Sequence, residues 1–83
     1  SGLVIVGADM FEYNGVKYLT PQEASDTLKI PRPTIYQWCR NQRVEIMQPD
    51  KSAELKAVGL IDSQYLIEVD SLLERHRKVH LGE

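Results

Sequence analysis

The sequence predicts a small α+β domain, and three observations lead to this fold class. An Asn-Gly pair between two aromatic and β-branched stretches indicates a β-hairpin near the start of the chain. A strong helix-start signal at Thr20 is followed by two short helical segments joined by a tight turn. Apolar residues then recur at helical spacing from Val69 to about His80. Because 83 residues have room for one small hydrophobic core, we expect a single compact domain.

The composition is that of a soluble globular chain, with 42% hydrophobic and 27% charged residues. The single cysteine, Cys39, excludes an internal disulfide and fits a reducing cytoplasm. The longest apolar runs, such as Leu3–Val6, are too short to cross a bilayer, and the sequence shows no signal-peptide pattern. We therefore expect a cytoplasmic protein with no membrane partner.

The net charge of −2 is unevenly distributed along the chain. Residues 29–43 hold four basic and no acidic side chains (+4), whereas residues 44–70 hold two basic and six acidic ones (−4). Because salt screens charges beyond about 10 Å, phosphate binding needs a local positive face and not a basic total. The basic segment is therefore either a phosphate-binding face or an ordinary solvated helix, and its charge alone leaves both interpretations open.

The predicted hairpin spans Phe11 to Tyr18. Asn14-Gly15 suits the two positive φ angles of a type I′ turn, and the flanking residues favour strands. Further upstream, Leu3–Val6 either adds a strand or is loosely held near the N-terminus.

The first helix is expected to begin directly after Thr20. Pro21 suits the first helical position, and Glu23 completes a capping box with Thr20. Leu19 and Ala24 have the spacing of a hydrophobic staple. The inner face of this helix is expected to consist of Ala24, Thr27 and Leu28.

Two prolines, Pro31 and Pro33, separate this helix from the next one. They disfavour helical geometry in the residues before them, so the first helix should end near Leu28 or Lys29. A second helix is expected from about Arg32 to Asn41. At about 100° per residue, its buried face would consist of Ile35, Trp38 and Cys39. Its exposed face would carry Pro33, Tyr36, Gln37 and Arg40.

The rest of the chain predicts a short strand pair and two helical stretches. Val44-Glu45-Ile46 alternates like a strand, and Tyr65-Leu66-Ile67 is a candidate to pair with it. Between them, residues 47–64 are polar, with a helical turn expected over 52–58 that ends at Gly59. The closing helix has Val69, Leu72, Leu73, His76 and Val79 at helical spacing.

The predicted cap, the two short helices and the tight turn between them contain Leu19-Thr20, Glu23-Ala24, Ile30, Arg32, Thr34-Ile35-Tyr36 and Trp38. These residues and their spacing resemble the helix-turn-helix of the excisionase/MerR type. The resemblance implies a small winged helix-turn-helix domain over residues 19–83, preceded by a strand and hairpin in residues 1–18 and ending in a closing helix. It also implies sequence-specific binding of double-stranded DNA through a recognition helix at about residues 32–41.

Three departures from that pattern are visible. Lys29 replaces a turn glycine, so the turn must use another geometry or hold Lys29 in a left-handed conformation. Pro31 replaces a serine cap, which leaves the second helix without a side-chain acceptor at its start. The segment between the two expected wing strands is about twice as long as the pattern requires, so whether residues 47–64 act as a wing stays open.

The resemblance assigns the DNA-binding residues to the second helix and the residues just after it. Gln37 pairs well with adenine, and Arg32 and Arg40 pair well with guanine. Tyr36, Arg43 and the Thr34 hydroxyl would contact phosphates. The full predicted set is Arg32, Pro33, Thr34, Tyr36, Gln37, Arg40 and Arg43.

Other conspicuous residues favour structural roles. Trp38 is expected to anchor the core, and Cys39 to be a small buried hydrophobe. His76 and His80 are one helical turn apart, but no third ligand accompanies them, so we expect no metal site. No nucleophile elbow, phosphate loop or Cys/His cluster is present, so we expect neither an enzyme nor a cofactor.

The predicted function is DNA binding as part of a transcriptional regulator, an excisionase-like factor or a segregation protein, in the cytoplasm and associated with the nucleoid. The partners would be double-stranded DNA and either a second copy on an adjacent half-site or another DNA-bound protein, with no small-molecule ligand. The alternative is a protein-interaction module that reuses the winged-helix fold. The acidic hairpin region, the acidic residues 44–70 and the negative net charge favour this alternative.

Overall fold

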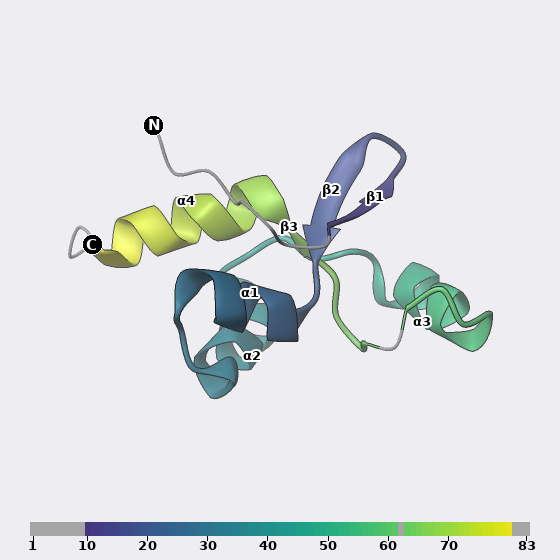
Figure 1. Cartoon of the computed structure of the whole chain (residues 1–83), viewed down its shortest axis with the longest axis horizontal. Helices are drawn as coiled ribbons and strands as arrows, with labels where there is room; N and C mark the ends of the chain where they lie inside the picture. Colours follow the sequence, from purple (N-terminus) through teal and green to yellow (C-terminus); the bar gives the residue numbers. More distant parts are fainter. Residues whose placement is uncertain (1–9, 62, 81–83) are drawn as a thin grey trace.

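A computed structural model describes residues 10–61 and 63–80 of the chain and confirms the α+β class. The expected N-terminal strand at Leu3–Val6 lies outside the described residues. The elements follow one another in the order β1 (Phe11–Tyr13), β2 (Val16–Leu19), α1 (Pro21–Leu28), α2 (Arg32–Arg40), α3 (Pro49–Ala57), β3 (Ile67–Glu68) and α4 (Val69–His80) (Figure 1).

The hairpin forms as the Asn-Gly turn predicts. Asn14 and Gly15 have φ angles of 53° and 78°, the positive values that a type I′ turn requires at both central positions. β1 and β2 pair in antiparallel register, with Phe11 opposite Tyr18. β3 then pairs with the other edge of β2, which gives a three-stranded antiparallel sheet in the order β1-β2-β3. The hairpin is therefore joined directly to the strand that leads into α4.

The start of α1 is confirmed in detail. The Thr20 hydroxyl accepts a hydrogen bond from the Glu23 amide at 3.2 Å, and the Glu23 carboxylate accepts one from the Thr20 amide at 3.2 Å. This reciprocal capping box satisfies two amides that would otherwise lack partners. Leu19 and Ala24 are both fully buried, as their staple spacing predicts.

The turn between α1 and α2 adopts one of the two expected geometries. Lys29 is left-handed, with φ 59° and ψ 43°, and its amide donates to the Ser25 carbonyl. The Ser25 hydroxyl donates to the Ile30 carbonyl and closes the turn further. Pro31 occupies the N-cap position of α2 without a side-chain hydrogen bond, as expected. α2 then runs to Arg40, with Asn41 as its C-cap.

The prediction of a strand at Val44-Glu45-Ile46 is wrong. Only an isolated bridge joins Ile46 to Ile67, with hydrogen bonds from the Met47 amide to the Leu66 carbonyl (2.8 Å) and from the Glu68 amide to the Glu45 carbonyl (2.9 Å). Ile67 belongs to β3, and the other edge of β3 pairs with β2. After the bridge, Pro49 starts a helix, so the ladder cannot continue.

The long segment after this bridge forms α3. The helical turn expected over 52–58 is present, but the helix starts three residues earlier, because Pro49 occupies its first turn. Gly59, with a φ of 82°, follows the C-cap Val58, as the sequence predicts. Residues 47–64, for which the sequence left the presence of a β-wing undecided, therefore contain a helix.

The core has two parts. The larger one packs α1, α2, β3 and α4 together through Leu19, Ala24, Leu28, Ile35, Trp38, Cys39, Val44, Ile67, Val69 and Leu72. The smaller one attaches α3 to the sheet through Tyr18, Met47, Leu55 and Leu66. Val79 does not continue the buried face of α4, because its side chain is 45% exposed near the end of the helix. Among the described residues, no helix is long and apolar enough to cross a membrane.

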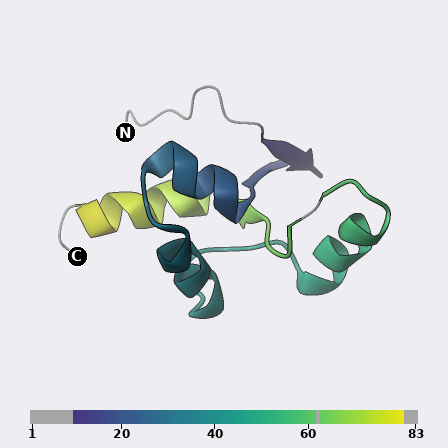
Figure 2. The same cartoon turned by 60° about the horizontal axis from the view of Figure 1, so that its bottom comes forward.

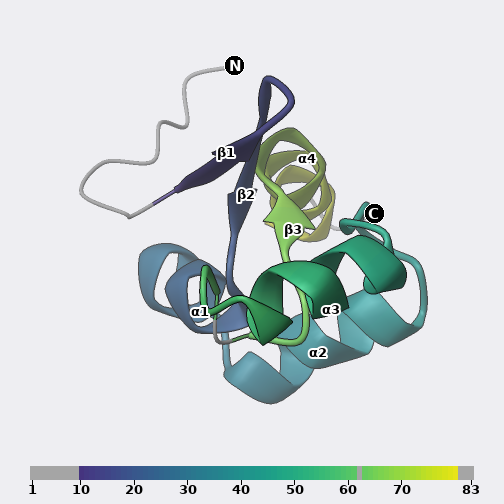
Figure 3. The same ribbon diagram turned by 90° about the vertical axis from the view of Figure 1, so that its right-hand side faces the viewer.

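The elements are arranged on two sides of the molecule. The hairpin and α4 lie on one side, and α1, α2 and α3 lie on the other (Figure 3). α2 and α3 both project from this second side, and the chain that returns from α3 to β3 runs between them (Figures 1 and 2).

Candidate nucleic-acid interface

The predicted DNA-binding residues gather on the outer side of α2. Pro33, Gln37 and Arg40 are exposed on the helix, opposite the buried Ile35-Trp38-Cys39 face. Exposed Arg32 begins the helix, and Thr34 and Tyr36 are half-buried along its length. Exposed Arg43 lies just beyond the helix, and its amide donates to the Trp38 carbonyl at 2.8 Å. The fold thus presents all seven side chains on or beside one short helix.

Arg32 is held by the first helix. Its Nη1 atom donates to the Gln22 amide oxygen at 2.9 Å, and the Gln22 amide nitrogen donates to both carboxylate oxygens of Asp26 at 3.0 Å. Asp26 therefore fixes which end of the Gln22 amide faces Arg32. Sequence reasoning did not include Gln22. The Gln22–Asp26 spacing within one helix could have been found from the sequence, but the bond to Arg32 depends on how α1 packs on α2.

Tyr36 also has a partner that sequence reasoning missed. Its ring meets the Tyr65 ring edge-on, with 5.8 Å between the ring centroids and an angle of 60° between the ring planes. Tyr65 comes from the segment that returns from α3 to β3, and no local pattern in the sequence links it to α2. The contact holds the outer face of α2 next to the α3 region.

Trp38 fixes α2 to the body of the domain, which confirms its expected place in the core. Its side chain is 7% exposed, and the Arg75 guanidinium of α4 lies 5.6 Å from its ring centroid. The Arg75 Nε atom is buried and has no hydrogen-bond partner within the described ranges. Beyond α2, the Glu45 amide donates to the Ser71 hydroxyl of α4 at 2.8 Å. α4 therefore contacts both α2, through Arg75, and the segment that follows α2, through Ser71.

Cys39 is a buried structural residue, as expected. It is 4% exposed, and burial raises the pKa of its thiol to about 11, although the nearby Arg40 charge acts in the opposite direction. The thiol therefore stays protonated at neutral pH and is a poor nucleophile.

His76 and His80 of α4 lie close to each other, but no third metal-ligating side chain joins them among the described residues. The His76 and His80 rings are 4.7 Å apart, and burial lowers the pKa of His76, with the neighbouring His80 as a second cause. The described part of the chain contains no group of three or more His, Cys, Asp and Glu side chains arranged to hold a metal ion.

The charges around α2 are not neutralised within the described residues. The two ion pairs found there lie on other helices, Lys51–Glu54 on α3 and Glu74–Arg77 on α4. Arg40 and Arg43 are exposed, and neither takes part in these ion pairs. This arrangement suits an anionic partner.

Capping box, tight turn and outward-facing second helix together define a helix-turn-helix module. A family model described as a helix-turn-helix domain matches residues 18–78, well over half of the chain, and the protein belongs to this excisionase-like family. Neither a curated protein nor a solved structure matches the chain significantly. Membership of the family indicates DNA binding, and the expected resemblance to the excisionase-type helix-turn-helix is confirmed.

Proposed function

We propose that the protein is a sequence-specific, winged helix-turn-helix module that binds double-stranded DNA with α2 in the major groove. One observation carries the proposal: α2 buries Ile35, Trp38 and Cys39 and exposes Gln37 and Arg40 on its opposite face, where the described residues form no ion pair. Because that face has no role in packing, its chemistry is available to a partner.

The side chains on this face suit two kinds of contact. Gln37 has the donor and acceptor that pair with adenine, and Arg32 and Arg40 have the paired donors that match guanine. Thr34, Tyr36 and Arg43 suit phosphates, which position a protein on the duplex without reading its sequence. Pro33 stiffens the first turn of the helix.

The short length of α2 favours binding of DNA together with a second protein. α2 has nine residues, so one copy touches only a few base pairs. We propose that a second copy on an adjacent half-site, or another DNA-bound protein, supplies the remaining contacts. Such a module would serve a transcriptional regulator, an excisionase-like factor or a segregation protein, in the cytoplasm at the nucleoid.

The proposal is tested by selecting preferred duplexes from a random library and titrating a selected and a scrambled duplex at several salt concentrations. The expected result is tighter binding of the selected duplex and an affinity that falls steeply with salt, with a slope of about −0.9 per phosphate contact. An absence of enrichment, together with salt-independent or undetectable binding, would contradict it.

A protein-interaction module is the second candidate. Val58 and Leu60, at the end of α3, are 67% and 63% exposed, and residues 44–70 carry a net charge of −4. Exposed apolar side chains in an acidic setting suit a protein surface better than a phosphate backbone. This candidate takes precedence if the selection experiment finds no DNA preference.

A further inference from the structure

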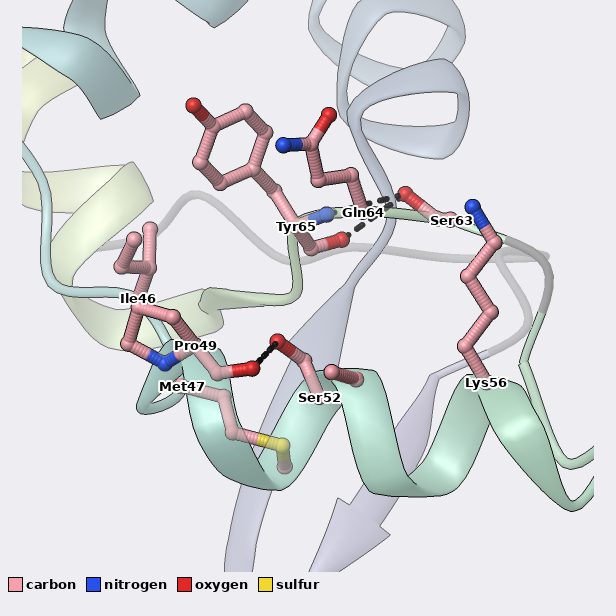
Figure 4. A pocket seen from close by; sticks show the side chains of 9 residues that line it. Ile46, Met47, Pro49, Ser52, Lys56, Ser63, Gln64 and Tyr65 are labelled. Carbon is pink, nitrogen blue, oxygen red and sulfur yellow. Dashed lines mark hydrogen bonds between the residues drawn. The ribbon is translucent and has the colours of Figure 1, made fainter.

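Arg32 differs from the other predicted DNA-binding residues because its polar group has a partner in the free protein. Its Nη1 atom donates to the Gln22 side-chain oxygen at 2.9 Å. The other polar side chains of the predicted set make no hydrogen bond within the described ranges: Thr34, Tyr36, Gln37, Arg40 and Arg43. Tyr36 has only a ring contact, with Tyr65, whose ring points away from α3 and Lys56 (Figure 4). The protein itself therefore holds one guanidinium at the start of α2.

Asp26 gives the contact between Gln22 and Arg32 its direction. A side-chain amide can turn over and present either its oxygen or its nitrogen to a neighbour. The Gln22 nitrogen donates to both carboxylate oxygens of Asp26 at 3.0 Å, so its oxygen is the atom that faces Arg32. No ion pair joins Asp26 to Arg32 in the described part of the chain. A neutral amide thus orients the guanidinium, and the charge of Arg32 stays available to an anionic partner.

The bond to Gln22 leaves one edge of the Arg32 guanidinium free. The Nε and Nη2 atoms of Arg32 make no hydrogen bond to the residues that the structure describes. Their N–H groups lie side by side and point in the same direction, which is the arrangement that pairs with the O6 and N7 atoms of guanine. Arg32 is also the first residue of α2, and the N-terminal residues of a recognition helix are the ones that meet base edges.

We infer that Gln22 and Asp26 are positioning residues that set the base specificity of Arg32, because they direct its Nε–Nη2 edge at a guanine. An arginine side chain has many rotamers, and holding one of them before binding lowers the entropic cost of the contact. Without Gln22, the guanidinium can also turn to a phosphate, and phosphate contacts carry no sequence information. This inference rests on the proposed function and extends the residues that determine specificity from α2 to α1.

The experiment first locates the base pair that Arg32 contacts. Preferred duplexes are selected from a random library with the parent protein, and Arg32→Ala identifies the base pair at which the preference is lost. Four duplexes that differ only at this base pair are then titrated, together with a scrambled duplex, at several salt concentrations. The parent should prefer guanine there by about 5- to 140-fold, the range for a bidentate pair of arginine and guanine.

Gln22→Ala should lower this guanine preference about two- to tenfold, because one hydrogen bond that orients Arg32 is lost. Its affinity for the scrambled duplex and its salt slope should stay near the parent's values, since every basic side chain remains. In the Arg32→Ala background, Gln22→Ala should leave the affinity for the selected duplex unchanged. A residue that contacts DNA itself would lower this affinity in both backgrounds.

Asp26→Asn tests the direction of the Gln22 amide. An asparagine side chain can pair with either end of Gln22, so the amide is free to turn its nitrogen toward Arg32 and the guanine preference should fall. Asp50→Asn is the matched control for charge, because Asp50 is exposed in the first turn of α3 and has no bond to Arg32 within the described ranges. This control should change the affinity for all duplexes alike and leave the guanine preference unchanged.

A Gln22→Ala variant that keeps the parent's guanine preference would overturn the inference, and the proposed function would stand if Gln37→Ala still loses affinity for the selected duplex. Equal losses from Gln22→Ala with and without Arg32 would also overturn it, as would an Arg32→Ala variant that keeps every base preference. An unchanged preference in Asp26→Asn would overturn the role of Asp26. If the parent prefers no duplex, the proposed function fails together with the inference. Melting curves that match the parent's would show that each variant is folded.

Discussion

The place of α2 in the domain depends on the side chains that it buries, and Trp38 is the largest of them. Its ring packs into the same core as Leu19, Ile67 and Leu72, and Arg75 covers it from α4. On the other face of the helix, Gln37 and Arg40 have no packing role. Stability and the proposed DNA recognition are thus assigned to two faces of one helix, and a substitution on either face tests one property at a time.

We expect Trp38→Ala to unfold most of the protein at room temperature. Truncating a large buried aromatic residue costs about 3–5 kcal/mol, and a domain of this size has little more stability in total. Circular dichroism and a thermal melt measure the loss. Gln37→Ala is the control, because exposed substitutions change stability by about 0.5 kcal/mol or less. A Trp38→Ala variant that melts like the parent would contradict the assigned role of this residue.

At the scale of elements, the turn between α1 and α2 carries an identifiable cost. Lys29 has the left-handed conformation that a glycine adopts without strain. For a residue with a Cβ atom, this conformation costs about 1 kcal/mol or more in free energy. The capping box at Thr20 and the bond from Ser25 to Ile30 hold the turn in place despite this cost.

Replacing Lys29 by glycine should therefore raise the free energy of unfolding by up to about 1 kcal/mol. Chemical denaturation of the parent, Lys29→Gly and Lys29→Ala separates strain from charge, because both variants lose the ammonium but only the glycine relieves the backbone. Equal stability of the two variants would show that the conformation of Lys29 stores no strain.

Elements with local signals were predictable from the sequence, and elements that depend on distant partners were not. The Asn14-Gly15 turn and the Thr20 capping box draw their stability from residues within one turn of each other. In contrast, Ile67 lies within reach of both β2 and Ile46, and only the packed structure shows that β2 takes the longer pairing. The bond from Arg32 to Gln22 and the Tyr36–Tyr65 contact likewise join segments whose distance in space cannot be derived from local patterns.

At the scale of the whole molecule, positive charge is concentrated on α2 and the residues that flank it, whereas α1 carries two carboxylates and the charges of α3 cancel. The chain is acidic in total, yet residues 29–43 contribute +4. Such a polarity favours one orientation toward a polyanion, because the acidic regions are repelled while the basic face is attracted. The family-level function thus agrees with a negative net charge.

The chain should be a monomer in solution without DNA. Val69 and Leu72 of α4 are buried within the domain, so its exposed Val79 adds too little apolar surface for a stable dimer through this helix. Sedimentation equilibrium over a range of protein concentrations measures the state. A tight dimer in the absence of DNA would contradict this prediction and would direct attention to the outer face of α4.

The contrast between Gln37 and Arg43 tests the central claim, that α2 reads DNA sequence, most directly. Each is replaced by alanine, and both variants are titrated with a selected and a scrambled duplex. We expect Gln37→Ala to lose about 1–3 kcal/mol on the selected duplex and much less on the scrambled one. Arg43→Ala should weaken both duplexes about equally and lower the salt slope by about one unit. Equal losses on both duplexes for Gln37→Ala, or no loss for either variant, would contradict the account.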